Sequence, residues 1–161
     1  MKNLPSEDAR LDALIFARTA AFAAAKPDAA RGATLFAQNC AACHRVKDIG
    51  GNLGPSLDGI GSRTIQRTIE DILDPSRNID PNFRLTTVTL KNGETKSGVN
   101  LRPEGPATLL RDPATNEESS IPTADIESIA ASPVSPMPAA YDTLLSESDF
   151  FDVITYLRAT L

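Results

Sequence analysis

The sequence predicts a mainly α-helical fold that is interrupted by a small antiparallel β insertion. Apolar residues recur at helical spacing near both ends of the chain. Residues 83–132 differ, because β-branched residues alternate there with Pro, Gly and Asp-Pro turn signals. We therefore divide the chain into an N-terminal helix or linker over residues 1–27, a helical domain made of residues 28–82 and 133–161, and an inserted β subdomain over residues 83–132.

Four helices are predicted from apolar periodicity and from residues that cap or stop a helix. They cover residues 6–25, residues 29–39, residues 64–73 and the stretch from residue 147 to the C-terminus. Asp28 and Ser146 are the expected N-caps of the second and the last helix, because their side chains can accept hydrogen bonds from free backbone N–H groups. Lys26-Pro27 ends the first helix and Asp74-Pro75 ends the third, since the residue before a proline disfavours the helical conformation.

Five short strands are predicted in the insertion. They cover residues 83–90, 95–101, 107–111, 117–121 and 127–131. Lys91-Asn92-Gly93-Glu94 joins the first two strands, and Asn-Gly is typical of a tight hairpin turn. Such strands predict a small antiparallel barrel or a curled sheet, similar to SH3-like or Sm-like folds.

Cys40-Ala41-Ala42-Cys43-His44 holds both cysteines and the single histidine of the chain. This C-x-x-C-H pattern is typical of covalent haem attachment. Two thiols on one turn can each add to a haem vinyl group, and the histidine that follows can give its Nε2 atom to the iron. The pattern thus predicts one covalent haem c, anchored by Cys40 and Cys43, with His44 as an iron ligand.

Three other interpretations of the motif are weaker. A redox-active dithiol of the thioredoxin type needs a βαβ context, which the flanking residues do not offer. A structural zinc site needs four ligands, and the motif supplies three. A disulfide between Cys40 and Cys43 would leave His44 without a role.

Composition argues against nucleic-acid binding and against a membrane span. The formal charge is −5 and tryptophan is absent, so nothing resembles a basic, aromatic nucleic-acid surface. The most apolar N-terminal stretch, residues 11–25, contains Arg18 and does not predict a membrane span. Glu7 and Asp8 stand where a signal peptide would be basic. Because c-type haem is attached outside the cytoplasm, we expect a periplasmic or otherwise extracytoplasmic location and a chain that is a piece of a longer exported protein.

The order of helices, motif, Gly-Pro loop and methionine loop resembles a class I c-type cytochrome. This resemblance implies that Gly32 and Phe36 pack against Tyr156 where the first and last helices of the family cross. It also implies that the carbonyl of Pro55 accepts a hydrogen bond from Nδ1 of His44, which orients the ring and raises its basicity. Arg63 is a candidate partner for a haem propionate.

Met137 is the expected second iron ligand. The chain has no second histidine, and Met137 is its one internal methionine, held between Pro136 and Pro138. The family places its distal methionine shortly before the last helix, where Met137 stands. A thioether opposite histidine raises the reduction potential and closes the iron to small ligands, as an electron carrier requires. No catalytic residues are expected.

The β insertion makes the chain similar to a particular group of c-type cytochrome domains. Over about residues 31–161 it resembles the C-terminal haem-binding domain of large planctomycete and verrucomicrobial proteins. The matching segments are Leu53-Gly54-Pro55, Ile72-Leu73-Asp74-Pro75-Ser76, Val88-Thr89-Leu90-Lys91-Asn92-Gly93, Ile121-Pro122-Thr123-Ala124-Asp125-Ile126 and Ser135-Pro136-Met137-Pro138. The resemblance implies a redox partner or a fused dehydrogenase domain as the electron donor. Two alternatives remain open: a haem sensor or peroxidase-like enzyme with an open distal site, and a partner-docking role of the β insertion.

Overall fold

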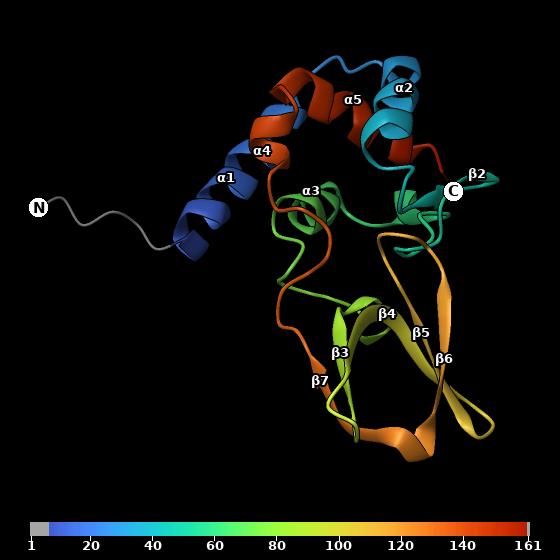
Figure 1. The fold of residues 1–161 in the computed structure, drawn as a ribbon. Helices are drawn as coiled ribbons and strands as arrows, with labels where there is room; N and C mark the ends of the chain where they lie inside the picture. Colours follow the sequence, from blue (N-terminus) through green and yellow to red (C-terminus); the bar gives the residue numbers. More distant parts are fainter. Residues whose placement is uncertain (1–6, 161) are drawn as a thin grey trace, which may run out of the picture. The chain divides into compact units, whose positions relative to one another are not determined.

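A computed structural model describes residues 7–160 of the chain. The chain folds as two compact units (Figure 1). The helical unit comprises Met1–Arg77 and Pro138–Leu161, and the β unit comprises Asn78–Met137. The chain therefore passes between the units twice, once after Arg77 and once after Met137.

The helical unit confirms the predicted helices, with small shifts at their ends. Its elements are α1 (Glu7–Phe22), α2 (Ala29–Asn39), β1 (Arg45–Val46), β2 (Ile49–Gly50), the 3-10 helix η1 (Ile60–Ser62), α3 (Ile65–Leu73), α4 (Tyr141–Leu144) and α5 (Glu147–Arg158). The predicted N-caps are confirmed as well: Asp28 accepts hydrogen bonds from the backbone of Ala30 and Arg31, and Ser146 accepts one from Asp149. The β1–β2 hairpin, η1 and α4 were not predicted.

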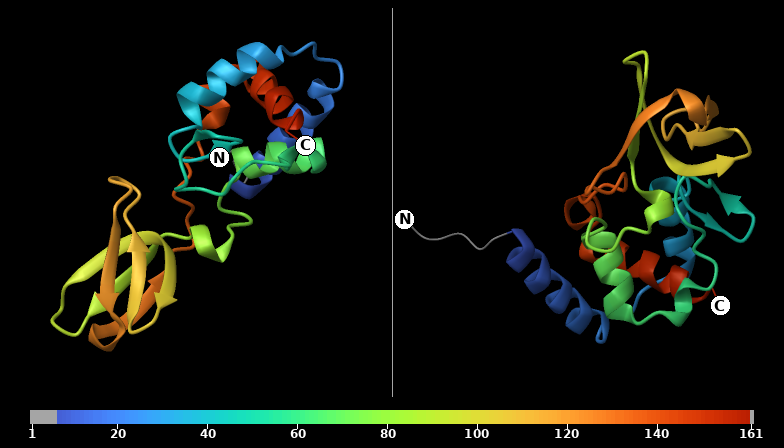
Figure 2. Two further views of the ribbon diagram at one scale, coloured as in Figure 1. Left: turned by 90° about the vertical axis from the view of Figure 1, so that its right-hand side faces the viewer. Right: turned by 90° about the horizontal axis from the view of Figure 1, so that it is seen from below.

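Helices α2 and α5 cross closely and lie side by side in both views of Figure 2. Gly32 makes this possible, because a Cβ atom there would lie 2.0 Å from the carbonyl oxygen of Asp152 and 2.9 Å from Cβ of Tyr156. Next to this contact, the rings of Phe36 and Tyr156 have centroids 5.4 Å apart. The predicted packing of Gly32 and Phe36 against Tyr156 is therefore confirmed.

Helix α1 shares the core of the helical unit. Leu11 and Ile15 are buried, and the ring of Phe22 packs edge-on against that of Phe151. Arg18 is also buried: its guanidinium lies 5.1 Å from the ring centroid of Phe150. These contacts bind α1 to the helices that follow it in the chain.

The β unit is a five-stranded antiparallel sheet. Its elements are the 3-10 helix η2 (Pro81–Phe83), β3 (Thr86–Leu90), β4 (Thr95–Glu104), β5 (Ala107–Arg111), β6 (Glu118–Pro122), the 3-10 helix η3 (Thr123–Asp125) and β7 (Ile126–Ala131). The strand order is β6-β5-β4-β3-β7. Among the described strands β6 does not pair with β7, so the sheet stays open and does not close into the barrel that was one of the two predicted forms.

The β unit has a small core of its own, formed by Val88, Leu90, Leu110 and Ile121. The Asn-Gly turn is confirmed between β3 and β4, where Gly93 has a φ of 86°. Its backbone N–H donates to the carbonyl of Leu90 over 2.8 Å. At the other end of the sheet, Ser132 donates its N–H to the carbonyl of Leu85 over 2.8 Å, which brings the two ends of the insertion together.

Candidate functional site

The C-x-x-C-H motif continues directly from the last turn of α2. The backbone N–H of Cys40 donates to the carbonyl of Phe36 over 2.8 Å, as in a helix that is about to end. The N–H groups of Cys43 and His44 then both donate to the carbonyl of Cys40, over 3.1 and 2.9 Å. This turn places both cysteines and the histidine on one short, hydrogen-bonded segment.

The imidazole of His44 is oriented by one hydrogen bond, 2.9 Å from Nδ1 to the carbonyl oxygen of Pro55. A carbonyl oxygen can only accept, so Nδ1 carries the proton and the lone pair of Nε2 is free. Burial lowers the pKa of His44, and the bond to Pro55 opposes part of that shift. The ring is therefore neutral at neutral pH, which is the state that binds a metal.

Two glycines let the following loop pack against the motif. A Cβ atom at Gly54 would lie 2.7 Å from Cε1 of His44, and one at Gly51 would lie 2.4 Å from the carbonyl oxygen of Ala42. Both backbone N–H groups are used, Gly54 donating to the carbonyl of Cys43 and Gly51 to that of Ala41, each over 2.8 Å. Larger side chains at either position would push the loop, and with it Pro55, away from His44.

Asp58 holds the same loop from its far end, a role that the sequence pattern did not predict. Its carboxylate accepts hydrogen bonds from the N–H of Lys47 over 2.5 Å and from the hydroxyl of Ser56 over 3.1 Å. Lys47 needs this support because its φ is 53°, a left-handed value that is uncommon for residues other than glycine. The backbone hydrogen bond from Lys47 lowers the pKa of Asp58. The sequence contains one hint of this role: Asp58 follows Ser56 by two positions in a loop with Gly-Pro, a spacing that is typical of a turn held by side-chain hydrogen bonds.

The two cysteines are free thiols, Cys40 half-buried and Cys43 exposed. Burial and the neighbouring Cys43 raise the pKa of Cys40 to about 11. Within residues 7–160 no group of three or more His, Cys, Asp or Glu side chains is arranged to hold a metal ion.

The remaining predicted site residues lie in different surroundings. Arg63 is exposed and pairs with Asp71, with 2.7 Å between Nη1 and a carboxylate oxygen, so its expected propionate contact would compete with an existing ion pair. Met137 is half-buried at the end of the β unit, where its backbone N–H donates to the hydroxyl of Ser135 over 3.1 Å. Its ligation of the iron stays a prediction.

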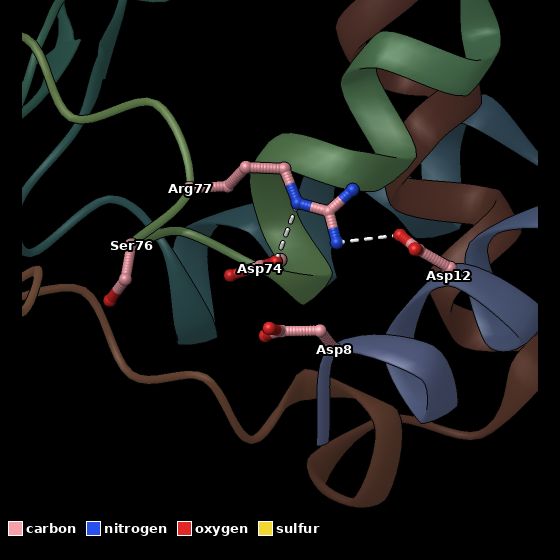
Figure 3. A pocket seen from close by; sticks show the side chains of 5 residues that line it. All are labelled: Asp8, Asp12, Asp74, Ser76 and Arg77. Atoms are coloured by element: carbon pink, nitrogen blue, oxygen red, sulfur yellow. Dashed lines mark hydrogen bonds and ion pairs between the residues drawn. The ribbon is translucent and has the colours of Figure 1, made fainter. Parts of the chain in front are cut away.

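A shallow hollow of about 430 Å³ lies between the N-terminal part of α1 and the end of α3, and it contains no residue of the motif (Figure 3). Arg77 spans it, with ion pairs of 2.7 Å to Asp12 and 2.8 Å to Asp74, while Asp8 faces the same space. The arrangement ties α1 to the point where the chain leaves the helical unit.

Comparison with known families points to the same segment. The family model for cytochrome c matches residues 29–104, which run from α2 through the motif and into β4. No curated protein matches the chain. The match supports a c-type cytochrome domain, which binds one covalently attached haem c and uses it for electron transfer. The described helices include none that is long and apolar enough to cross a membrane.

Proposed function

We propose that this chain is a monohaem c-type cytochrome domain that carries single electrons, in which His44 and Met137 would be the protein ligands of the iron. The observation that supports it most directly is the hydrogen bond from His44 Nδ1 to Pro55, because it fixes the tautomer that leaves Nε2 free for iron. Free thiols at Cys40 and Cys43, on the same turn, fit covalent attachment of the porphyrin. The chain is thus an electron carrier and not an enzyme.

Each of these residues has a separate task. Cys40 and Cys43 would hold the cofactor through thioether bonds, formed when each thiol adds across a vinyl group. His44 would give its Nε2 lone pair to the iron, and the acceptor at Pro55 orients the ring and increases its electron density. The bound haem supplies the one-electron Fe(III)/Fe(II) couple. Gly51, Gly54 and Asp58 keep the loop that carries Pro55 in place.

Met137 is proposed as the distal ligand because of the ligand types that the chain contains. The sequence has no second histidine, and Pro136 and Pro138 restrict the backbone on both sides of Met137. The hydrogen bond to Ser135 restricts it further. A thioether from Met137 would stabilise ferrous iron and would disfavour the binding of oxygen or peroxide.

The electron donor is proposed to be a partner oxidoreductase or a fused dehydrogenase domain, in an extracytoplasmic compartment. This proposal follows from the resemblance to the planctomycete and verrucomicrobial haem-binding domains, whose insertion has the same place in the sequence. A docking role of the β unit is favoured by the exposed apolar side chains of Ile129 and Val134.

The test is spectroscopic. A pyridine haemochrome assay on the protein matured with haem should give one haem c per chain, and replacing both cysteines by Ala should abolish covalent attachment. The ferric wild type should be low-spin and show the weak long-wavelength band of methionine ligation. Met137→Ala should lose that band and lower the reduction potential, whereas the control Val134→Ala in the same exposed segment should change neither.

The alternative of an open distal site has one observation in its favour, since the family match ends at residue 104 and does not reach Met137. Carbon monoxide separates the two cases. A native reduced protein that binds it rapidly, with a high-spin spectrum before addition, would replace the electron-carrier proposal by that of a sensor or a peroxidase-like enzyme.

A further inference from the structure

Tyr141 is buried beside the motif although it lies almost a hundred residues further along the chain. It is the first residue of α4 and is 8% exposed. Its hydroxyl donates a hydrogen bond to the backbone carbonyl of Asn39 over 2.9 Å. Asn39 is the last residue of α2 and directly precedes Cys40. A phenol thus contacts the backbone next to the first haem-anchoring cysteine.

Helix α2 itself provides no hydrogen-bond donor for the carbonyl of Asn39. The last carbonyls of an α-helix have no N–H group of the next turn to accept from. The carbonyl of Phe36 is shared by the N–H groups of Cys40 and Ala41, which ends the regular pattern. Tyr141 therefore supplies the donor at the point where α2 gives way to the motif.

Burial raises the pKa of the Tyr141 phenol, and the electrostatic influence of Cys40 and Cys43 acts in the same direction. The ring is buried, so Tyr141 is part of the core of the helical unit as well as the donor to Asn39.

The chain connects Tyr141 to the proposed distal ligand. Met137 precedes it by four positions, and four extended residues span at most about 14 Å. Pro138 stiffens the intervening segment because its φ is fixed. Once the hydroxyl of Tyr141 is bound to Asn39, the distance from Met137 to the motif is limited by this short tether, wherever the rest of the β unit lies.

We propose that Tyr141 is a positioning residue for the distal ligand, and that its hydrogen bond to Asn39 holds the segment carrying Met137 within reach of the iron. The inference rests on the proposed ligation by Met137 and deepens it. It predicts that loss of one hydroxyl group weakens the bond between methionine and iron without removing the methionine.

The experiment compares Tyr141→Phe with wild type and with Tyr156→Phe, all as mature haem proteins. The control makes the same chemical change at a ring that packs on Phe36. Added imidazole competes with methionine for ferric iron. Because a neutral hydrogen bond corresponds to about a fivefold change in an equilibrium constant, Tyr141→Phe should bind imidazole about fivefold more tightly, and its reduction potential should fall. Tyr156→Phe should match the wild type in both measurements.

Two results would overturn the inference, and they are distinguishable. If Met137→Ala leaves the spectrum of the wild type unchanged, methionine is not the ligand and the proposed ligation fails together with the role of Tyr141. If Met137→Ala removes the methionine band but Tyr141→Phe binds imidazole as wild type does, the ligation stands and the role of Tyr141 alone is refuted. A thermal midpoint measured for each variant separates a general loss of stability, which would not by itself change imidazole affinity, from a local effect on the ligand.

Discussion

Replacing Gly32 by Ala tests whether the crossing of α2 and α5 is as close as the structure indicates. A Cβ atom at this position would lie 2.0 Å from the carbonyl oxygen of Asp152 and 2.5 Å from its carbonyl carbon. Carbon atoms that touch normally stay about 3.5–4.0 Å apart. Both atoms of Asp152 belong to the backbone of α5, so no side-chain rotation can relieve the overlap and the helices must separate.

The expected cost follows from two opposing effects. Overpacking of a well-packed contact costs up to about 3 kcal/mol, whereas Ala stabilises a helix interior by about 1 kcal/mol relative to Gly, so Gly32→Ala should lose about 2 kcal/mol. For a chain of this size that corresponds to a fall of about 4–8 °C in the thermal midpoint.

The assay is thermal and urea unfolding of the mature protein, followed by circular dichroism and by the haem absorption. Thr34→Ala serves as the matched control, because residue 34 is exposed on the same helix and should change stability little. A Gly32→Ala variant that is as stable as wild type, or more stable by the helix-propensity gain, would show that the two helices are not in contact at this point and would refute the reasoning.

Three further predictions concern single side chains. Gly54→Ala should displace the ring of His44, since its Cβ would lie 2.7 Å from Cε1, and a larger high-spin fraction in the absorption spectrum would reveal it. The pKa of Asp58 is lowered in the folded protein, so its contribution to stability is complete above the ordinary Asp pKa and is lost as the pH falls through the pKa of the folded state. Asp58→Asn should therefore reduce the loss of stability at acidic pH, measured as the free energy of unfolding against pH. An unchanged acid dependence would contradict the role of Asp58. Arg18 has a buried Nη1 without a hydrogen-bond partner among the described residues, while its Nε lies 3.3 Å from a carboxylate oxygen of the exposed Glu147. Arg18→Met should remove a penalty of about 1–3 kcal/mol for Nη1, against losses of about 1 kcal/mol for the attraction to Phe150 and up to about 1 kcal/mol for the ion pair. Chemical unfolding decides this case, and a loss of more than 1 kcal/mol would mean that the guanidinium is satisfied.

Local patterns in the sequence were sufficient for much of the fold. Helix α2 begins after Asp28 and ends at Asn39, as predicted, because an N-cap and apolar periodicity act within a few residues. The hairpin at Gly93 was predictable for the same reason. The hydrogen bond from His44 to Pro55 was expected from the family resemblance, while haem attachment at Cys40 and Cys43 stays a prediction.

Features that depend on distant residues were not predictable in this way. The hydrogen bond between Tyr141 and Asn39 joins positions 102 residues apart, and nothing in the periodicity of either segment indicates it. Helix α4 has four residues and no side-chain cap, so it forms through its packing and not through its own propensity. Asp58 acts on the left-handed backbone of Lys47, a conformation that the residue type does not favour. The charge of Arg63 suits a propionate partner, but its ion pair with Asp71, eight residues further along the chain, is not visible in the sequence pattern.

The bond between Leu85 and Ser132 has a consequence for how the chain assembles. Contact between α2 and α5 closes a loop that contains the whole insertion, and the entropy cost of a loop grows only with the logarithm of its length, about 0.6 kcal/mol for each doubling. Once β3 has paired with β7, residues 85 and 132 are neighbours. The loop that the contact between α2 and α5 must close is then effectively shortened by the length of the insertion. A β unit with its own core and joined ends can thus be accommodated between the two parts of a helical domain at little cost to the folding of that domain.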